Sequence, residues 1–192
     1  MPIRFEMLNC SHDRKSFVCK DANFNEWLLG VALNSQAAGM CKVWVALNDD
    51  NVIVGYYSLS SWVIPLDLIP EGTFKKTPKQ QQISAALIGK LATAQAYEGR
   101  GIGRGMIYDA AHRLELGPMG VNCIALHALK NDPKLLKWYL KTGFMPLKDQ
   151  THYLFLPMSR IMATIATFDA QQAALTSVPE PSAAPPPTLE TE

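Results

Sequence analysis

The amino-acid sequence predicts a mixed α/β domain (α/β or α+β in class), in which helices flank a central mixed β-sheet. Strand-like apolar runs alternate with helix-like segments in the order β-β-loop-β-α-β-α-β. Apolar residues make up 48% and charged residues 18% of the chain, a composition typical of globular proteins. We expect one domain over residues 1–168, because the Ala- and Pro-rich segment 169–192 has the composition of a disordered tail.

The first predicted helix covers residues 24–38. Its apolar face consists of residues spaced three and four apart, namely Trp27, Leu28, Val31 and Ser35. Asp21 or Asn23 precedes this helix and has a side chain suited to capping its N-terminus.

Two strands follow this helix as a predicted hairpin. Residues 42–47 and 52–60 are rich in apolar and β-branched side chains, and the polar turn 48–51 separates them. The next segment, 72–82, is polar and basic and is predicted to be a surface loop. Residues 84–93 are apolar enough to form a central strand.

Helices and strands alternate in the rest of the domain. The predicted elements are a helix at 104–116, a strand at 121–128, a helix at 133–141 and short strands at 145–147 and 152–158. Gly117 and Pro118 end the first of these helices. Asp132 and Pro133 begin the second, because proline in a first turn loses no helical hydrogen bond.

Charge and cysteine content exclude several classes of protein. Residues 1–168 carry 18 Lys and Arg against 13 Asp and Glu, and this mildly basic balance suits a polyanionic cofactor or RNA without requiring either. The four cysteines form no C-x-x-C pair, which argues against a disulfide scaffold and a zinc site. No segment resembles a signal peptide or a membrane span. We expect a cytoplasmic protein that uses no metal.

The strongest local signal is the run Glu98–Gly105 (EGRGIGRG), between a predicted strand and a predicted helix. Its alternating glycines permit close approach of a ligand to the backbone. Consecutive N–H groups at a helix start, with Arg100 and Arg104 beside them, suit a pyrophosphate. The run contains neither G-x-x-x-x-G-K-[ST] nor G-x-G-x-x-G. Taken alone, it is explained equally well by a glycine turn that packs a helix on a strand.

The wider arrangement resembles the GNAT acetyltransferases. The coenzyme A loop of that family reads Q/R-x-x-G-x-G/A, which residues 98–103 match with Glu98 in place of Gln or Arg. Asn131 and residues 138–144 (WYLKTGF) resemble the family's later N…FYxKxGF segment, whose tyrosine lies near the sulfur of the coenzyme. The resemblance implies a GNAT fold and transfer of an acetyl group from acetyl-coenzyme A to a primary amine.

The N-terminal half resembles, more narrowly, the GNAT toxins of bacterial toxin–antitoxin pairs. Residues 17–28 (FVCKDANFNEWL), 54–59 (VGYYSL) and 87–92 (LIGKLA) are similar to F-x-C-G-x-x-x-L-D-x-W-L, V-V-G-Y-Y-x-L and L-L-G-R-L-A in those toxins. The chain departs from them at Lys20, where they have Gly, and at Lys90, where they have Arg. The resemblance implies acetylation of the α-amine of aminoacyl-tRNA, inhibition of translation, and a ribbon-helix-helix antitoxin as partner.

The resemblance also implies roles for individual residues. Tyr139 would be the catalytic general acid that protonates the departing thiolate, against the alternative of an ordinary core tyrosine. A backbone N–H of residues 91–93 would polarise the acetyl carbonyl. The residues expected to bind the coenzyme are Leu91, Ala92, Thr93, Gly99, Arg100, Gly101, Ile102, Gly103, Arg104 and Asn131. His127 and Glu98 are open candidates for a general base, although an α-amine is partly neutral near neutral pH and needs no strong base.

Several basic residues are candidates for gripping an RNA backbone. They are Lys75, Lys76, Lys79 and Lys90, with Arg14, Lys15 and Lys20. A solvated surface role is the better explanation for any one of them except Lys90, which lies next to the expected acetyl site.

Two other functions stay open at this point. The oligomeric state also stays open, and a homodimer is one possibility. One is a GNAT enzyme for a small-molecule amine or a protein lysine or N-terminus, although the basic stretch 75–90 does not suit a small cationic amine. The other is a non-catalytic coenzyme A-fold binding module, which predicts loss of Tyr139 or of the glycines, and neither is lost.

Overall fold

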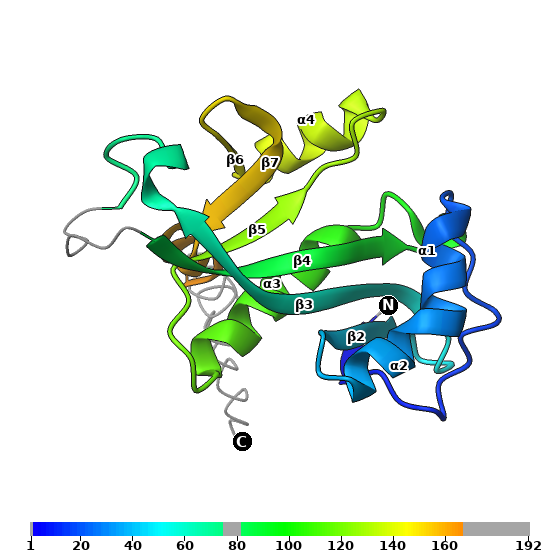
Figure 1. Cartoon of the computed structure of the whole chain (residues 1–192). Helices are drawn as coiled ribbons and strands as arrows, with labels where there is room; N and C mark the ends of the chain where they lie inside the picture. The colour runs from blue at the N-terminus through cyan, green and yellow to red at the C-terminus, as the bar shows by residue number, and fades with distance from the viewer. Residues whose placement is uncertain (1, 75–81, 167–192) are drawn as a thin grey trace, which may run out of the picture.

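The computed structural model describes residues 2–74 and 82–166. A seven-stranded sheet lies at its centre, with the strand order β1-β2-β3-β4-β5-β7-β6, and helices pack against it (Figure 1). Neighbouring strands are antiparallel except β4 and β5, which are parallel. The predicted mixed sheet with flanking helices is therefore confirmed. The predicted tail, Lys75, Lys76 and Lys79 lie outside the described residues.

The strands follow the predicted order, with one addition. They are β1 (Arg4–Met7), β2 (Lys42–Leu47), β3 (Ile53–Pro65), β4 (Gln82–Thr93), β5 (Cys123–His127), β6 (Met145–Leu147) and β7 (Gln150–Pro157). The edge strand β1 was not predicted, because four residues are too few for a periodic pattern to stand out. Strand β3 runs beyond the predicted end at Ser60 as far as Pro65, and β4 pairs with it along this extension.

The N-terminal helical segment contains a π-helical turn. It is made of α1 (Ala22–Glu26), the π turn η1 (Trp27–Val31) and α2 (Ala32–Ala37), and the Asp21 side chain caps it by accepting from the Asn23 N–H. The π turn breaks the 3.6-residue repeat, so that Leu28 and Ala32 are buried whereas Val31 is 46% exposed. The prediction that Val31 belongs to the apolar face was therefore wrong.

The two later helices begin and end close to the predicted residues. Helix α3 (Ile102–Leu116) follows the glycine run, and α4 (Pro133–Lys141) is capped by the Asp132 side chain, which accepts from the Leu135 N–H at 2.9 Å. Single 3-10 turns occur at η2 (Leu66–Leu68) and η3 (Gln95–Tyr97). Residues 158–166 form a further helical segment that was not predicted, and its Ile161 is buried.

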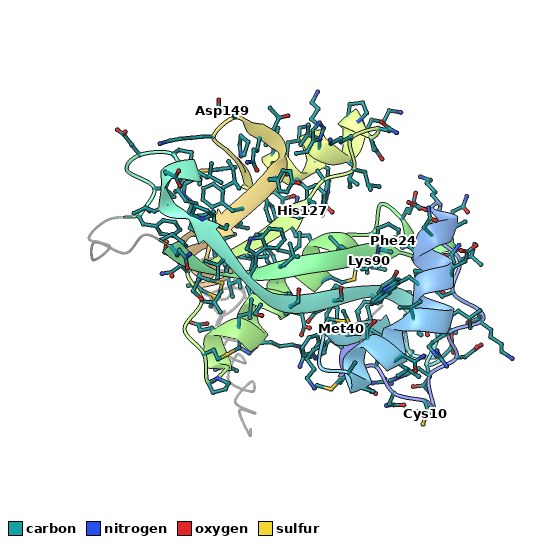
Figure 2. The ribbon with its side chains drawn as sticks, viewed as in Figure 1. Cys10, Phe24, Met40, Lys90, His127 and Asp149 are labelled. Atoms are coloured by element: carbon teal, nitrogen blue, oxygen red, sulfur yellow. The ribbon has the colours of Figure 1, made fainter. Side chains whose placement is uncertain are left out.

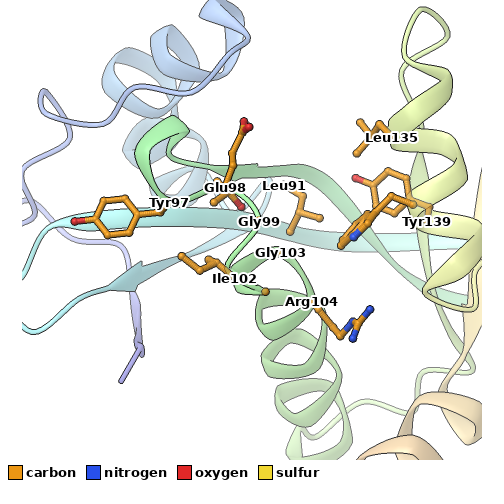
Figure 3. A pocket seen from close by; sticks show the side chains of 12 residues that line it. Leu91, Tyr97, Glu98, Gly99, Ile102, Gly103, Arg104, Leu135 and Tyr139 are labelled. Carbon is orange, nitrogen blue, oxygen red and sulfur yellow. The ribbon is translucent and has the colours of Figure 1, made fainter. Parts of the chain in front are cut away.

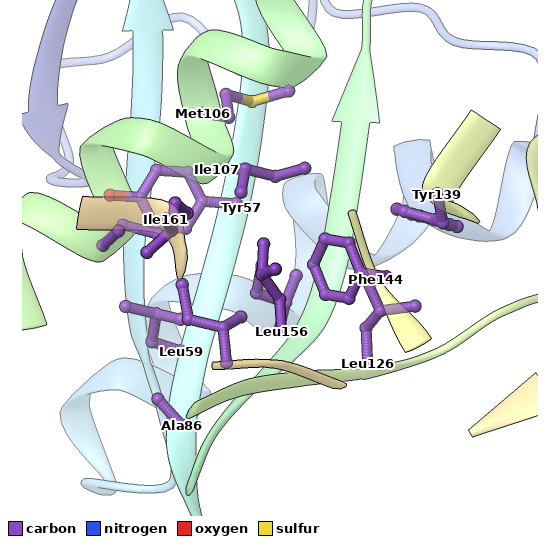
Figure 4. Packing of buried hydrophobic residues seen from close by; sticks show 14 of the residues in the cluster. Tyr57, Leu59, Ala86, Met106, Ile107, Leu126, Tyr139, Phe144, Leu156 and Ile161 are labelled. Atoms are coloured by element: carbon purple, nitrogen blue, oxygen red, sulfur yellow. The ribbon is translucent and has the colours of Figure 1, made fainter. Parts of the chain in front are cut away.

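Adjacent tyrosines of β3 divide the core into two sides. Because successive strand residues point to opposite faces, Tyr56 packs with the helical segment α1–α2 while Tyr57 packs with α3, and both are fully buried. The Tyr56 hydroxyl donates to the Phe24 carbonyl oxygen at 2.8 Å. On the α3 side, the cluster around Tyr57 continues to Tyr139 of α4 (Figure 4).

A network of polar side chains between β3 and α3 connects this helix to the sheet. The Tyr57 hydroxyl donates to the Asp109 carboxylate, and the Arg113 Nε donates to the same oxygen at 2.7 Å. Burial, followed by the hydrogen bond to Asp109, raises the pKa of Tyr57 well above its usual range. The Arg113 guanidinium also lies over the ring of Trp44, 5.2 Å from its centre. Helix α3 is thereby held in one position along the strands.

Replacing Asp109 tests this anchor. Asp109→Ala leaves the Tyr57 hydroxyl and the Arg113 guanidinium without their shared acceptor, so we expect a loss of about 1–3 kcal/mol in the free energy of unfolding. Urea denaturation measures it. Glu115→Ala, an exposed acid on the same helix, is the control and should stay within about 0.5 kcal/mol of wild type. An equally small effect of Asp109→Ala would show that the network does not anchor α3.

Candidate active site

A cleft of about 590 Å³ opens between the N-terminus of α3, strand β4 and helix α4 (Figure 3). It is lined by Leu91, Thr93, Tyr97, Glu98, Gly99, Gly101, Ile102, Gly103, Arg104, Leu135, Trp138 and Tyr139. The glycine run and the later tyrosine segment, which are distant in the sequence, therefore meet at one place. Tyr97, Leu135 and Trp138 were not predicted, because only the fold shows which neighbours of the motifs turn toward the cleft.

The cleft exists because β4 and β5 separate. Their parallel pairing covers only Ala85–Ile88 and Cys123–Leu126, whereas β4 continues to Thr93. The N–H groups of Lys90 and Ala94 point toward β3, where they bond the Ser58 Oγ and the Val54 carbonyl oxygen. Since N–H directions alternate along a strand, those of Leu91 and Thr93 point to the open edge.

Because of this alternation, the three residues of β4 that were predicted to bind the coenzyme do not all face the cleft. Leu91 and Thr93 line the cleft, so either N–H could donate to an acetyl carbonyl. The N–H of Ala92 points toward β3 instead, and its side chain is buried with the α1–α2 cluster. The structure therefore does not bring Ala92 to the cleft.

The glycine run forms a concave backbone surface at the start of α3. Gly99 and Gly101 have φ values of +74° and +81°, a left-handed conformation that side chains rarely adopt. A Cβ at either position would meet no atom within 4 Å, so the space above them is open. Gly101 caps α3 without a side-chain hydrogen bond, which leaves the first N–H groups of the helix available to an anion.

Gly103 has a different role in the run. A Cβ there would lie 3.4 Å from the Trp138 ring, an ordinary van der Waals contact, so Gly103 faces α4 across the cleft. Arg104 lines the cleft, whereas Arg100 turns away and lies over the Tyr97 ring, 5.1 Å from its centre. Asn131 is exposed and does not line the cleft.

Tyr139 lies on the α4 side of the cleft, across from the glycine run (Figure 3). The rings of Trp138 and Phe144 pack edge-on against it, at 5.0 and 5.6 Å between centres, and it is 5% exposed. Burial, followed by the charge of Asp132, raises the pKa of the Tyr139 hydroxyl well above its usual range, so the hydroxyl keeps its proton at neutral pH. Within the described residues this hydroxyl makes no hydrogen bond, and its proton is available to a ligand.

The two candidates for a general base lie in different surroundings. Glu98 lines the cleft, but its carboxylate forms an ion pair with the Lys20 ammonium. The His127 ring packs edge-on against Trp62 and Tyr153, at 4.5 and 4.2 Å between ring centres, on the sheet face away from α3. Burial lowers the pKa of His127, so its imidazole is neutral at pH 7.

Lys90 is also on the face away from α3. Its ammonium lies over the rings of Phe24 and Trp27, 4.8 and 6.0 Å from their centres (Figure 2). Both rings belong to the helical segment α1–α2, which covers that face. Lys90 is therefore separated from the glycine run by the sheet and belongs to a different surface.

The cleft fits a long ligand with an anionic group at one end. The α3 end offers open backbone N–H groups and Arg104, while the α4 end offers the apolar side chains of Leu135 and Trp138. These features match the diphosphate and the thioester arm of acetyl-coenzyme A. Within residues 2–74 and 82–166, no group of three or more His, Cys, Asp or Glu side chains could hold a metal ion, and no helix is long and apolar enough to cross a membrane.

Comparison with known proteins gives matches over most of the chain. The Acetyltransferase (GNAT) family matches residues 5–144. A protein of Sinorhizobium fredii named "Probable toxin TacT" is 26% identical over 158 residues, covering 78% of this chain and 87% of its own length. The "tRNA-acetylating toxin" of Mycobacterium tuberculosis is 25% identical over 146 residues, covering 75% of this chain and 86% of its own.

Solved structures share the fold. A crystal structure of a KacT mutant superposes with a TM-score of 0.76 at 22% identity, covering 85% of this chain and 99% of KacT. AtaT complexed with acetyl-methionyl-tRNAfMet gives a TM-score of 0.76 at 19% identity, with coverages of 85% and 99%. At these identities the likeness establishes the architecture.

Gly101 provides a direct test of the anion site. Gly101→Asp forces a side chain into left-handed backbone and adds a carboxylate to the open N–H groups, so we expect the Kd for acetyl-coenzyme A to rise at least about tenfold. Isothermal titration calorimetry measures it. Gly120→Asp, at an exposed glycine with no positive φ and no close neighbour, is the control. Equal binding by both variants and wild type would remove the glycine run from the coenzyme site.

Proposed function

The chain belongs to the Acetyltransferase (GNAT) family and is an acetyl-coenzyme A-dependent N-acetyltransferase, and we propose that its acceptor is the α-amine of aminoacyl-tRNA. The single observation that carries this proposal is the pairing of a cleft of about 590 Å³ with an aromatic surface carrying Lys90 on the opposite face of the sheet. One of the similar proteins is named for acetylating tRNA, and another is a toxin by name.

The surface opposite α3 supports a nucleic-acid acceptor. The Lys90 ammonium provides a positive charge there for a phosphate, held in place by Phe24 and Trp27. Further along the same face, the His127 ring packs edge-on against both Trp62 and Tyr153, and Tyr153 is 38% exposed. Aromatic faces beside a cation suit the unpaired nucleotides at the end of a tRNA, because any base can stack on them.

Tyr139 is the residue that we propose to act in the chemical step. When bound, acetyl-coenzyme A supplies the acetyl group as a thioester. The acceptor nitrogen bonds to the acetyl carbon and loses a proton to solvent, the carbon–sulfur bond breaks, and the Tyr139 hydroxyl gives its proton to the departing sulfur. Solvent then returns a proton to the phenolate. Burial raises the pKa of this hydroxyl, so the hydroxyl is protonated at neutral pH and can act only as a donor. The same burial disfavours the phenolate, which therefore regains a proton readily.

The backbone of β4 complements this role. The N–H groups of Leu91 and Thr93 point to the open edge and are held by the pairing of β4 with β3, so they need not reorganise to donate to developing negative charge. The Leu91 side chain lies between the glycine run and Tyr139 in the cleft (Figure 3). We propose no protein base, because Glu98 is paired with Lys20 and the His127 imidazole packs edge-on against the rings of Trp62 and Tyr153.

We further propose a cytoplasmic toxin that inhibits translation and is restrained by an antitoxin of the ribbon-helix-helix class. Solved structures of similar fold include AtaT bound to the C-terminus of the antitoxin AtaR, and the KacTA–DNA complex. A homodimer is the oligomeric state that we propose for the free protein, to be tested by light scattering.

Tyr139→Phe tests the proposed function. The substitution keeps the ring and its packing and removes only the proton donor, so the Kd for acetyl-coenzyme A should not change. We expect acetyl transfer to charged tRNA to fall by about 10²–10⁴-fold, the usual contribution of a general acid. Production of wild type without an antitoxin should stop growth, while the variant should be tolerated.

Two results would contradict the proposal in different ways. Equal transfer rates for wild type and Tyr139→Phe would mean that water or a backbone group protonates the sulfur. Failure of wild type to acetylate charged tRNA, with efficient acetylation of a small amine or a protein, would favour the alternative GNAT substrates.

Lys90 variants test the RNA-binding surface separately. Lys90→Met keeps the aliphatic stem over the rings and removes the charge, so the KM for charged tRNA should rise. Because one phosphate contact is lost, the plot of log KM against log salt should flatten by about 0.7–0.9. Lys90→Arg should restore the wild-type KM for charged tRNA and the wild-type salt slope. The KM for acetyl-coenzyme A should stay the same in each variant. An unchanged salt slope in Lys90→Met would show that Lys90 does not contact the RNA.

A further inference from the structure

Two departures from the motifs that the sequence resembles, one from the GNAT toxins and one from the wider GNAT family, meet in the folded protein. Lys20 replaces a glycine, and Glu98 replaces the glutamine or arginine that begins the coenzyme loop. The two side chains are 78 positions apart in the sequence, yet the Lys20 ammonium donates to the Glu98 carboxylate. Each unusual residue is therefore the partner of the other.

Glu98 places negative charge where the ligand is also negative. It directly precedes Gly99, whose backbone begins the concave surface, and it is the only acid among the described residues that line the cleft. A carboxylate there opposes the phosphates of the coenzyme, and the water-filled rim screens that repulsion only in part. The ion pair with Lys20 offsets the charge of Glu98.

The fold holds Lys20 close to the cleft. The Gln95 N–H donates to the Val18 carbonyl oxygen at 2.9 Å, which ties this segment to the turn that precedes Glu98. The Cys19 N–H donates to Asn25 Oδ1 at 2.8 Å, and Asp21 caps the helix that follows. The backbone on both sides of Lys20 is thus fixed, which keeps the Lys20 side chain within reach of Glu98.

Stability alone does not explain this pair. The Lys20 side chain is 70% exposed and that of Glu98 is 37% exposed, and ion pairs so open to water add little to the stability of a fold. The effect of the pair on a bound polyanion is larger, because the ligand carries several charges at the same rim.

We propose that Lys20 is a positioning residue for coenzyme binding, which acts by neutralising Glu98 at the rim of the phosphate-binding loop. The proposal rests on the coenzyme site of the proposed function. Without Lys20, Glu98 repels the phosphates. Without Glu98, the exposed Lys20 side chain has no partner to hold it at the rim; it extends into water, where its charge is screened and contributes little.

A double-mutant cycle on the full chain tests this coupling. The variants are Lys20→Ala, Glu98→Gln and the double variant, and the probes are acetyl-coenzyme A and S-acetylpantetheine, which has the thioester arm without phosphate. Binding is followed by tryptophan fluorescence, to which Trp138 in the cleft wall contributes. Lys148→Ala, at an exposed lysine in the turn between β6 and β7, is the control. Thermal melts check that each variant is folded.

Lys20→Ala should raise the Kd for acetyl-coenzyme A by about five- to tenfold at low salt and by less at high salt. Glu98→Gln should bind at least as tightly as wild type, and the double variant should bind within about twofold of Glu98→Gln. Binding of S-acetylpantetheine should not change.

Three results would overturn the inference. The first is an unchanged Kd for acetyl-coenzyme A in Lys20→Ala. The second is an equal rise in that Kd on removing Lys20 whether or not Glu98 is present. The third is an equal rise in the Kd for S-acetylpantetheine. Failure of wild type to bind acetyl-coenzyme A would overturn the coenzyme site itself and this inference with it, whereas failure to acetylate tRNA would leave the cycle intact.

Discussion

The separation of β4 from β5 is the constraint on which the rest of the structure depends. Their parallel pairing ends at Ile88 and Leu126, and β4 continues for five more residues with one edge unpaired. Backbone N–H groups require a partner, so this open edge favours a ligand with a carbonyl group. The start of α3 and helix α4 flank the gap between the two strands on the same face of the sheet, and together they enclose the cleft. The Asp109 network keeps α3 in place while its N-terminus stays open to an anion.

The sheet also divides the work between its two faces. The coenzyme cleft lies on the face that α3 and α4 cover, where Tyr139 presents a hydroxyl that keeps its proton. The other face carries Lys90 with its two aromatic neighbours, and the rings that pack edge-on around His127. Donor and acceptor can therefore approach one reaction centre from opposite sides. We propose the second face as the acceptor surface, and there the charge of Lys90 is separated by the sheet from the apolar part of the cleft.

The sequence predicted the parts of the site that depend on local patterns. The glycine run and the tyrosine segment were found because unusual residue types recur at short spacing, and Asp132 and Pro133 marked the start of α4. Features set by tertiary geometry were not predictable. The π turn moved Val31 out of the apolar face, and strand alternation turned Ala92 away from the cleft while its neighbours face it. The contact of Arg100 with the Tyr97 ring also depends on the fold, and the pairing of Lys20 with Glu98 joins positions 78 apart in the sequence.

The most direct test of the account is to identify the atom that receives the acetyl group. Purified protein is incubated with isotopically labelled acetyl-coenzyme A and a pool of charged tRNAs, in the presence of small amines and a lysine-containing peptide. Nuclease digestion and mass spectrometry then locate the label. The account predicts label on the α-amine of aminoacyl-adenosine fragments, with little on the competing amines. Label on the small amines or on the peptide, with none on the aminoacyl fragments, would contradict it.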